Sequence, residues 1–207
     1  MSAAAIAVFA RAPVAGAVKT RLIPLLGAEG ALHLHRQLVE STLFRARDAA
    51  LGDVTLWIAD AADHAEVAVC VARQRVRLQA QRGADLGARM HAAFDATLAA
   101  HPHHGCLLIG TDCPALTPTH LQQAAAALAS HDVVLVPAHD GGYVLIGLAA
   151  PRPDLFHGIA WGTSDVLEAT RARIAAANLR CAELAPLPDL DTADDYRAAL
   201  AAGWIVA

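Results

Sequence analysis

Short, uninterrupted apolar runs alternate along this chain with longer stretches of helical spacing, and this alternation constrains the fold more than any other feature. The seven predicted strands are Ala4–Ala10, Val54–Ala59, Val76–Ala80, Cys106–Ile109, Val133–Val136, Tyr143–Leu148 and Arg180–Ala185. Runs that are apolar throughout are typical of strands covered on both faces. The pattern therefore predicts a three-layer α/β/α fold around a mostly parallel, mixed sheet.

Helices are predicted in the intervals between the strands. They are expected at Ala28–Ala50, along the run that steps from Leu86 to Leu98, after Thr117 with Pro118 at the first position, after Thr163 or Ser164, and from Thr192 to Gly203. Thr192 with Asp195 three residues later is an acidic form of the capping box. The short interval between Val136 and Tyr143 predicts one antiparallel segment. Since no linker or repeat interrupts the 207 residues, we expect one domain over 1–207.

Composition argues against several classes of partner. A net charge of −4 and a pI near 6.2 do not suit general nucleic-acid binding, which requires a basic face. No apolar run reaches the length of a membrane span, and the apolar opening 3–10 lacks the basic flank of a signal peptide. The four cysteines form no CxxC pair, as is typical of thiols in a reducing cytoplasm. We expect a cytoplasmic protein that binds neither nucleic acid nor a membrane.

The apolar end of the chain, residues 204–207, bears on the oligomeric state. It is equally compatible with packing on the chain's own sheet and with a homodimer interface.

A loop rich in basic residues follows the first predicted strand. Its candidate nucleotide- and phosphate-binding residues are Arg11, Gly16, Lys19, Thr20 and Arg21. A glycine loop supplies free backbone N–H groups, and the basic side chains add charge-assisted donors that suit a polyphosphate. The loop is not a Walker A motif, because Val18 stands where that motif needs glycine. A solvated loop paired with surface carboxylates is the alternative, and the concentration of basic residues directly after a strand favours phosphate binding.

Asp112 is the first candidate metal ligand. It lies just beyond a buried strand, between Gly110 and Pro114, which fix an exposed carboxylate in place. Magnesium prefers one or two protein carboxylates together with substrate phosphates. The structural alternative is an aspartate that only closes its own turn. We therefore expect Mg²⁺ or Mn²⁺ at Asp112.

Three further acidic or glycine-rich stretches have both functional and structural interpretations. Gly141 and Gly142 allow a close backbone approach to a ligand, and Asp140 can bind a ribose hydroxyl, a metal or an acceptor hydroxyl, but all three also suit a tight turn. Asp85, within Gln81–Gly87, can contact a base or sugar or cap the next helix. Asp191 lies in an acidic stretch that ordinary helix capping also explains.

These stretches are expected to meet. Ligands of open parallel sheets bind beyond the carboxyl ends of the strands. The loop 11–21, Asp112 and Asp140 all follow predicted strands, so we expect them to share one cleft with Asp191.

Eight segments resemble a known bacterial family. They are residues 9–13, 16–22, 85–90, 110–116, 140–143, 146–148, 161–163 and 189–192. In this order they resemble the radical-SAM/selenodomain-associated transferases, also described as arsenosugar-biosynthesis-type glycosyltransferases. That family belongs to the nucleotide-diphospho-sugar transferase superfamily and has the GT-A fold.

The resemblance implies roles for individual residues. It puts Lys19 and Arg21 near phosphates and Asp112 at the superfamily's metal-binding aspartate. In related nucleotidyltransferases a late acidic motif supplies a second metal ligand, which would be Asp191 here. The chain departs from the common Asp-x-Asp motif, since Cys113 and Pro114 follow Asp112. It also carries His139 where the family often has an acidic or small residue.

The resemblance further implies a metal-dependent transferase that uses a nucleotide-activated small-molecule donor and a small-molecule acceptor. A glycosyltransferase would need a carboxylate base, for which Asp140 is the candidate. A nucleotidyltransferase would depend on positioning and charge neutralisation by the Lys-Thr-Arg loop. The candidate catalytic residues are thus Asp140 and Lys19. The family favours glycosyl transfer, with nucleotidyl transfer and a non-catalytic nucleotide-binding module as alternatives.

Overall fold

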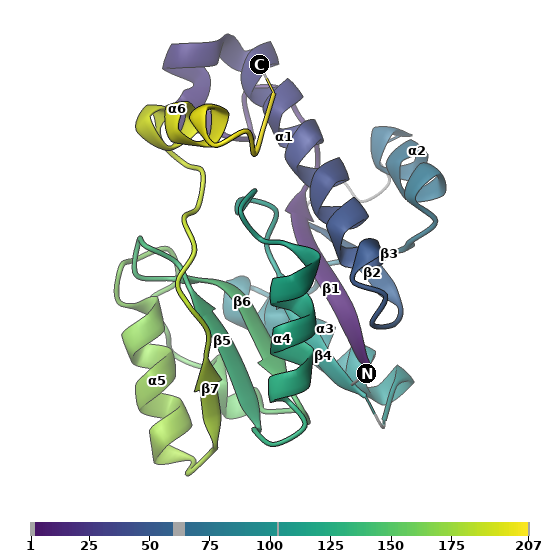
Figure 1. The fold of residues 1–207 in the computed structure, drawn as a ribbon, viewed down its shortest axis with the longest axis vertical. Helices are drawn as coiled ribbons and strands as arrows, with labels where there is room; N and C mark the ends of the chain where they lie inside the picture. The colour runs from purple at the N-terminus through teal and green to yellow at the C-terminus, as the bar shows by residue number, and fades with distance from the viewer. Residues whose placement is uncertain (1–2, 60–64, 103, 207) are drawn as a thin grey trace.

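A computed structural model describes residues 3–59, 65–102 and 104–206. It contains one seven-stranded sheet in the order β3-β2-β1-β4-β6-β5-β7 (Figure 1). The strands are β1 (Ala4–Arg11), β2 (Val54–Ala59), β3 (Arg77–Ala80), β4 (Gly105–Ile109), β5 (Val133–Pro137), β6 (Tyr143–Leu148) and β7 (Cys181–Glu183). All seven predicted strands are present, with ends that differ by at most two residues.

The sheet is mixed in the way the sequence predicts. β1 pairs in parallel with β2 and β4, β2 with β3, and β5 with β7. β6 runs antiparallel to both of its neighbours, β4 and β5. The antiparallel segment expected after Val136 is therefore confirmed. It is β6, which lies between two strands that both run opposite to it.

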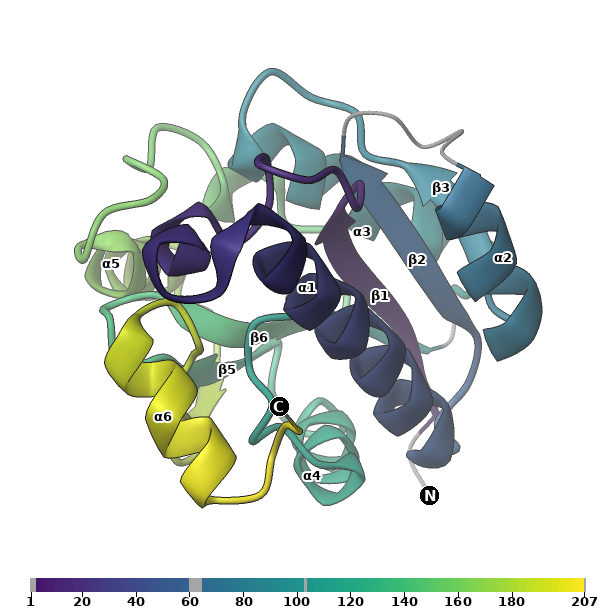
Figure 2. The same cartoon turned by 90° about the horizontal axis from the view of Figure 1, so that it is seen from above.

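Helices cover both faces of the sheet. They are α1 (Ile23–Asp48), α2 (Ala65–Gln74), α3 (Leu86–Ala100), α4 (Pro118–Ala127), α5 (Val166–Ala176) and α6 (Ala193–Ala201), with short 3-10 helices η1 (Thr20–Leu22) and η2 (Pro153–Leu155). Helices α1, α2 and α4 pack on one face, while α3 and α5 pack on the other (Figure 2). The predicted three-layer α/β/α fold is confirmed.

Each face has its own apolar core. On the first face Val8 of β1 packs with Leu43 of α1 and Leu121 of α4, all almost fully buried. On the second face Phe94 of α3 is 1% exposed and its ring stacks on that of Phe156 at 5.7 Å. Burying a side chain of this size contributes about 1.5–3 kcal/mol. The central strands are thus buried on both sides, which explains why they read as continuous apolar runs.

The end of the chain returns to the start of α1. Thr192 and Asp195 form the predicted capping box of α6. Leu190 and Ile205 pack with Leu22 and Leu38, so α6 lies against the beginning of α1 at the end of the sheet to which β1 points (Figure 1). Trp204 is 38% exposed, and Ala207 lies outside the described residues. The homodimer remains a prediction.

Three helix predictions need correction. α1 begins at Ile23 rather than Ala28, because Gly27, with φ 72°, joins two helical segments across a kink. The cap of α5 is Asp165 rather than Thr163 or Ser164; the Thr163 hydroxyl donates to the Ala160 carbonyl at 2.9 Å and accepts from the Asp165 N–H at 3.4 Å, just before the helix. The sequence interpretation also missed α2. None of the described helices is long and apolar enough to cross a membrane.

Candidate functional site

The loop after β1 turns the Lys19 side chain inward. Lys19 adopts a left-handed backbone conformation with φ 45° and ψ 42°, directly before η1. Such a conformation is unfavourable for a residue with a Cβ atom, so its surroundings must hold it. The buried side chains of Val18 and Leu22 anchor the loop on either side, and the Leu22 N–H donates to the Lys19 carbonyl at 2.9 Å. The loop therefore presents Lys19 in a fixed direction.

The Lys19 ammonium lies between two carboxylates. Its Nζ is 2.7 Å from Asp112 Oδ1 and 3.1 Å from Asp191 Oδ1. It also donates to the Leu190 carbonyl oxygen at 2.5 Å. The lysine side chain is only 5% exposed, and the two carboxylate side chains are 53% and 37% exposed. Three chain segments that are far apart in sequence thus meet around one cation.

A backbone contact fixes the two acidic segments relative to each other. The Leu190 N–H donates to the Asp112 carbonyl at 2.8 Å. Asp195 accepts hydrogen bonds from the backbone N–H groups of Asp191 and Thr192 at 3.1 and 2.7 Å. The capping box that begins α6 therefore also holds the Asp191 backbone in place.

A cavity of about 530 Å³, here called the basic cavity, opens beside this cluster. The candidate residues that line it are Arg11, Lys19, Thr20, Arg21, Asp112 and Asp191. Gln81 and Arg89 line it as well. Arg21 is 71% exposed and its Nη1 lies 3.7 Å from Asp191 Oδ2. The cavity therefore combines several basic side chains with two carboxylates, a composition suited to a metal–phosphate group.

A second cavity of about 520 Å³, here called the aromatic cavity, adjoins the first. Tyr143 and Trp161 line it together with Met90 and Asp140. The residues common to both cavities are Phe9, Arg21, Leu86, Gly110 and Asp191. Two ligands could therefore meet where the basic and aromatic cavities join.

Asp140 forms the turn that its sequence predicts and also lines the aromatic cavity. Its Oδ1 accepts from the Gly142 N–H at 2.8 Å. Burial, and then the nearby Asp140 carboxylate, raise the pKa of Asp189. Asp140 therefore closes its own turn and lines the cavity at the same time, because its side chain lies on the cavity wall.

Three candidate residues do not line either cavity. Gly16 has φ 78° and lies in the exposed part of the loop after β1. Asp85 is the cap of α3, and its Oδ1 accepts from the Ala88 N–H at 2.8 Å, as the capping alternative predicts. Gly141 approaches the Ser164 backbone rather than a cavity, since a Cβ atom there would meet the Ser164 carbonyl oxygen at 2.1 Å. The structure gives these three positions local structural roles.

Two basic or titratable residues of the basic cavity were given no role by the sequence. His35 of α1 is 4% exposed and its Nε2 is 3.0 Å from the Arg11 carbonyl oxygen. Arg89 of α3 lines the basic cavity from the opposite face of the sheet. His35 is the one titratable residue on the buried, mostly apolar stripe of the described helix α1, a pattern that could have singled it out.

Gln81 is held rigidly at the wall of the basic cavity. Its amide nitrogen donates to the carbonyls of Ala10 and Trp57 at 3.2 and 2.9 Å. Because both partners only accept hydrogen bonds, they fix which way the amide faces. Its carbonyl oxygen is the side-chain atom left to meet a ligand.

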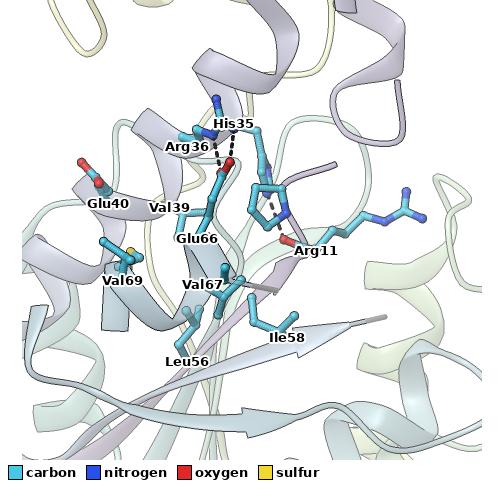
Figure 3. A pocket seen from close by; sticks show the side chains of 13 residues that line it. Arg11, His35, Arg36, Val39, Glu40, Leu56, Ile58, Glu66, Val67 and Val69 are labelled. Carbon is cyan, nitrogen blue, oxygen red and sulfur yellow. Dashed lines mark hydrogen bonds and ion pairs between the residues drawn. The ribbon is translucent and has the colours of Figure 1, made fainter. Parts of the chain in front are cut away.

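An apolar pocket of about 330 Å³ lies between α1, α2 and β2 (Figure 3). Val39, Leu56 and Val67 line it. Arg36 and Glu66 close one side of it through two hydrogen bonds of 2.7 and 2.5 Å. Its largely apolar wall does not suit a phosphate group, so the basic cavity is the better candidate for a nucleotide.

The residues around Lys19 fit a divalent metal. The ammonium acts as a stand-in cation whose three contacts are all oxygen atoms, two of them from carboxylates. Among the described residues no group of three or more His, Cys, Asp or Glu side chains could hold a metal by itself. Two carboxylates completed by substrate phosphates are the arrangement that magnesium prefers. The donor set therefore suits a metal that arrives with a nucleotide.

The buried His35 predicts an acid-sensitive stability. Burial lowers the pKa of His35, although its bond to the Arg11 carbonyl opposes this. As the pH falls, the unfolded chain therefore protonates His35 at a higher pH than the folded chain does. The stability that neutral His35 contributes is present above pH 6.5 and is lost as the pH falls through the folded-state pKa. We expect His35→Gln to flatten the acid-side loss of unfolding free energy measured by urea denaturation. The exposed His33→Gln is the control, and equal slopes in both variants would contradict the expectation.

The fold resembles that of several solved structures. A proposed nucleotide-diphospho-sugar transferase from Desulfovibrio desulfuricans G20 matches with a TM-score of 0.85 and 32% identity, over 96% of this chain and 86% of that chain. Rv0371c from Mycobacterium tuberculosis H37Rv, in complex with manganese, matches with a TM-score of 0.58 and 21% identity, over 96% and 98%. CMP:2-keto-3-deoxy-manno-octonic acid synthetase complexed with CTP matches with a TM-score of 0.57 and 15% identity, over 99% and 100%. The sheet is thus of the nucleotide-diphospho-sugar transferase and cytidylyltransferase type.

The family follows from the sequence match. Residues 42–163 match DUF2064, described as an uncharacterised protein conserved in bacteria. The chain belongs to this family. No curated protein matches it.

Proposed function

We propose that the chain works as one transferase domain over residues 1–207, which binds a nucleotide-activated donor with a divalent metal and transfers a group to a small-molecule acceptor. The observation that carries the proposal is the pair of adjoining cavities beside two carboxylates that already surround a cation. The similarity at 32% identity to a proposed nucleotide-diphospho-sugar transferase supports it.

The basic cavity is the proposed donor site. Arg11, Arg21 and Arg89 line it and offer planar, multiple donors that match phosphate oxygens. Gln81 presents a carbonyl acceptor, held by its two backbone bonds, to an N–H group of the base. In reactions that release a phosphate or diphosphate group, the protein contributes mainly by positioning the donor and neutralising its negative charge.

Asp112 and Asp191 are the proposed ligands of Mg²⁺ or Mn²⁺. Their Oδ1 atoms converge on the Lys19 ammonium, so they are already placed to share one cation. When bound, the metal would neutralise negative charge on the departing phosphate group. The manganese complex of Rv0371c supports a metal of this kind.

The aromatic cavity is the proposed acceptor site. Tyr143 and Trp161 provide large flat surfaces on which an acceptor can rest. Asp140 lies on the same wall and is the proposed base for an acceptor hydroxyl. The Gly142 N–H bond holds its carboxylate in a fixed orientation.

Glycosyl transfer from a nucleotide-sugar is the proposed reaction, and nucleotidyl transfer is the second candidate. The first is supported by the relative at 32% identity and by a carboxylate on the acceptor side. The second is supported by the basic loop after β1 and by the likeness to a synthetase complexed with CTP. The two reactions release different products, a nucleoside diphosphate in the first and pyrophosphate in the second.

Phosphorus NMR distinguishes them. The protein would be incubated with Mg²⁺ or Mn²⁺ and a panel of nucleotide-sugars and nucleoside triphosphates, with water and simple polyols as surrogate acceptors. We expect release of nucleoside diphosphate from a nucleotide-sugar, whereas pyrophosphate from a triphosphate would favour the second candidate. Tight nucleotide binding with release from no donor would favour the non-catalytic binding module instead.

Arg21 offers a test of the donor site. Because its guanidinium is 71% exposed and lines both cavities, its loss should not disturb the core. We expect Arg21→Ala to weaken nucleotide binding by about 1.5–3 kcal/mol, the range for charged hydrogen bonds, with little change in thermal stability. The control is Arg197→Ala, an exposed arginine of α6 paired with Asp194. Calorimetry that gives equal affinities for wild type and Arg21→Ala would reject the role.

A further inference from the structure

Lys19 carries the inference, because its charge is buried where a ligand is expected. Long basic side chains are almost never fully buried unless they are paired. The Lys19 side chain is 5% exposed, and its three oxygen contacts can take up all three ammonium protons. An ammonium held in this way cannot reach a phosphate at the same time.

The site's charges show what the ammonium does. The carboxylates of Asp112 and Asp191 both lie within hydrogen-bonding distance of the Lys19 ammonium. Arg21 lies further out, at 3.7 Å from Asp191, and is largely exposed, so solvent screens it. Lys19 is thus the buried cation that keeps the two carboxylates together.

A divalent metal would need the same oxygen atoms. Magnesium binds oxygen at about 2.0–2.1 Å, and the Asp112 and Asp191 oxygens here face Nζ at 2.7 and 3.1 Å. Two cations that share these oxygens would repel each other over a distance of only a few ångströms. Lysine and metal therefore exclude each other at this point.

We propose that Lys19 is an internal cation that occupies the metal position in the nucleotide-free protein and is displaced when a metal–nucleotide complex binds. Its side chain lines the basic cavity, so the displaced ammonium has donor phosphates to move to. The proposal rests on the metal–nucleotide site proposed above. Its consequence is coupling: metal binds weakly alone and tightly with nucleotide, and each ligand raises the affinity for the other by the same factor.

The test measures Mn²⁺ binding without nucleotide, by electron paramagnetic resonance of the free ion. Lys19→Met removes the charge and keeps much of the stem. We expect it to bind Mn²⁺ at least about tenfold more tightly than wild type, because a nearby positive charge is gone. Lys19→Arg keeps the charge, and its Mn²⁺ affinity should stay as weak as that of wild type. Should Lys19→Met fail to fold by circular dichroism, Lys19→Gln replaces it, since glutamine is neutral and keeps a hydrogen-bond donor near the end of its side chain.

Equal or weaker Mn²⁺ binding by the neutral variants would overturn the proposal and leave Lys19 as a fixed structural or phosphate-binding residue. Wild type gives an independent measurement, the Mn²⁺ affinity with a nucleoside diphosphate present. If nucleotide increases wild-type Mn²⁺ binding while the neutral variants match wild type without nucleotide, only the displacement idea fails. If nucleotide leaves wild-type Mn²⁺ binding unchanged, the metal–nucleotide site itself fails.

Discussion

Asp112→Asn is expected to abolish the Mg²⁺-dependent part of nucleotide binding, and any turnover, while the protein remains folded. Asparagine keeps the size of the side chain but removes the charge that a hard cation needs. The Asp112 side chain is 53% exposed, and its backbone carbonyl, not its carboxylate, receives the Leu190 N–H. In Asp112→Asn this backbone contact remains, and the buried Lys19 ammonium keeps Asp191 and the Leu190 carbonyl as partners, so we expect the fold to persist. Nucleotide affinity measured by calorimetry against Mg²⁺ concentration gives the result.

Two variants calibrate this result. Asp191→Asn should give a milder loss, because Asp191 is the proposed second ligand at the edge of both cavities. Asp194→Asn is the matched control, since that carboxylate is 93% exposed and pairs with Arg197 away from both cavities. The same magnesium dependence in Asp112→Asn as in wild type would show that Asp112 does not bind the metal.

Gly141→Ala is expected to have the largest effect on stability among the loop positions. The added Cβ would meet the Ser164 carbonyl oxygen at 2.1 Å, a backbone atom that cannot simply rotate away, and φ at Gly141 is 92°. The Gly141 carbonyl also accepts from the Leu167 N–H in the first turn of α5 at 2.9 Å. We expect a loss of about 2 kcal/mol or more, seen as a fall of roughly 4–8 °C in melting temperature.

Gly142→Ala is the control for this strain. Its added Cβ would meet only the Asp140 carboxylate, at 3.2 Å, and its φ lies outside the left-handed region. We expect a small change in melting temperature there. If the two variants have the same melting temperature, the close approach of the loop to the Ser164 backbone does not constrain Gly141.

Elements whose signals are local could be predicted from the sequence. Buried strands such as β4 and β6 are read from their continuous apolar runs, because both faces need apolar residues. The Thr192–Asp195 capping box begins α6 as predicted, because capping depends on residues within one turn. The capping alternative for Asp85 also follows from its position before Leu86.

Features that depend on distant contacts could not be predicted. The helix α2 is an exception, since Val67, Cys70 and Val71 recur at helical spacing and could have indicated it, although only Val67 is buried. Gly27 gives no sign in sequence that two helical segments continue across it. Lys19 meets Leu190 and Asp191 across 171 and 172 residues, a separation at which local patterns carry no information. Lys19 was predicted as a phosphate ligand, and only the fold reveals its carboxylate partners.

The most direct test of the account locates the metal. Amide signals of the wild-type protein would be recorded by NMR with a nucleoside diphosphate and small additions of Mn²⁺, whose unpaired electrons broaden signals close to the ion. We predict that broadening begins at Asp112, Asp191 and their neighbours in the basic cavity, and that it weakens when nucleotide is left out. Broadening centred elsewhere, or equal with and without nucleotide, would contradict a metal–nucleotide site between Asp112 and Asp191.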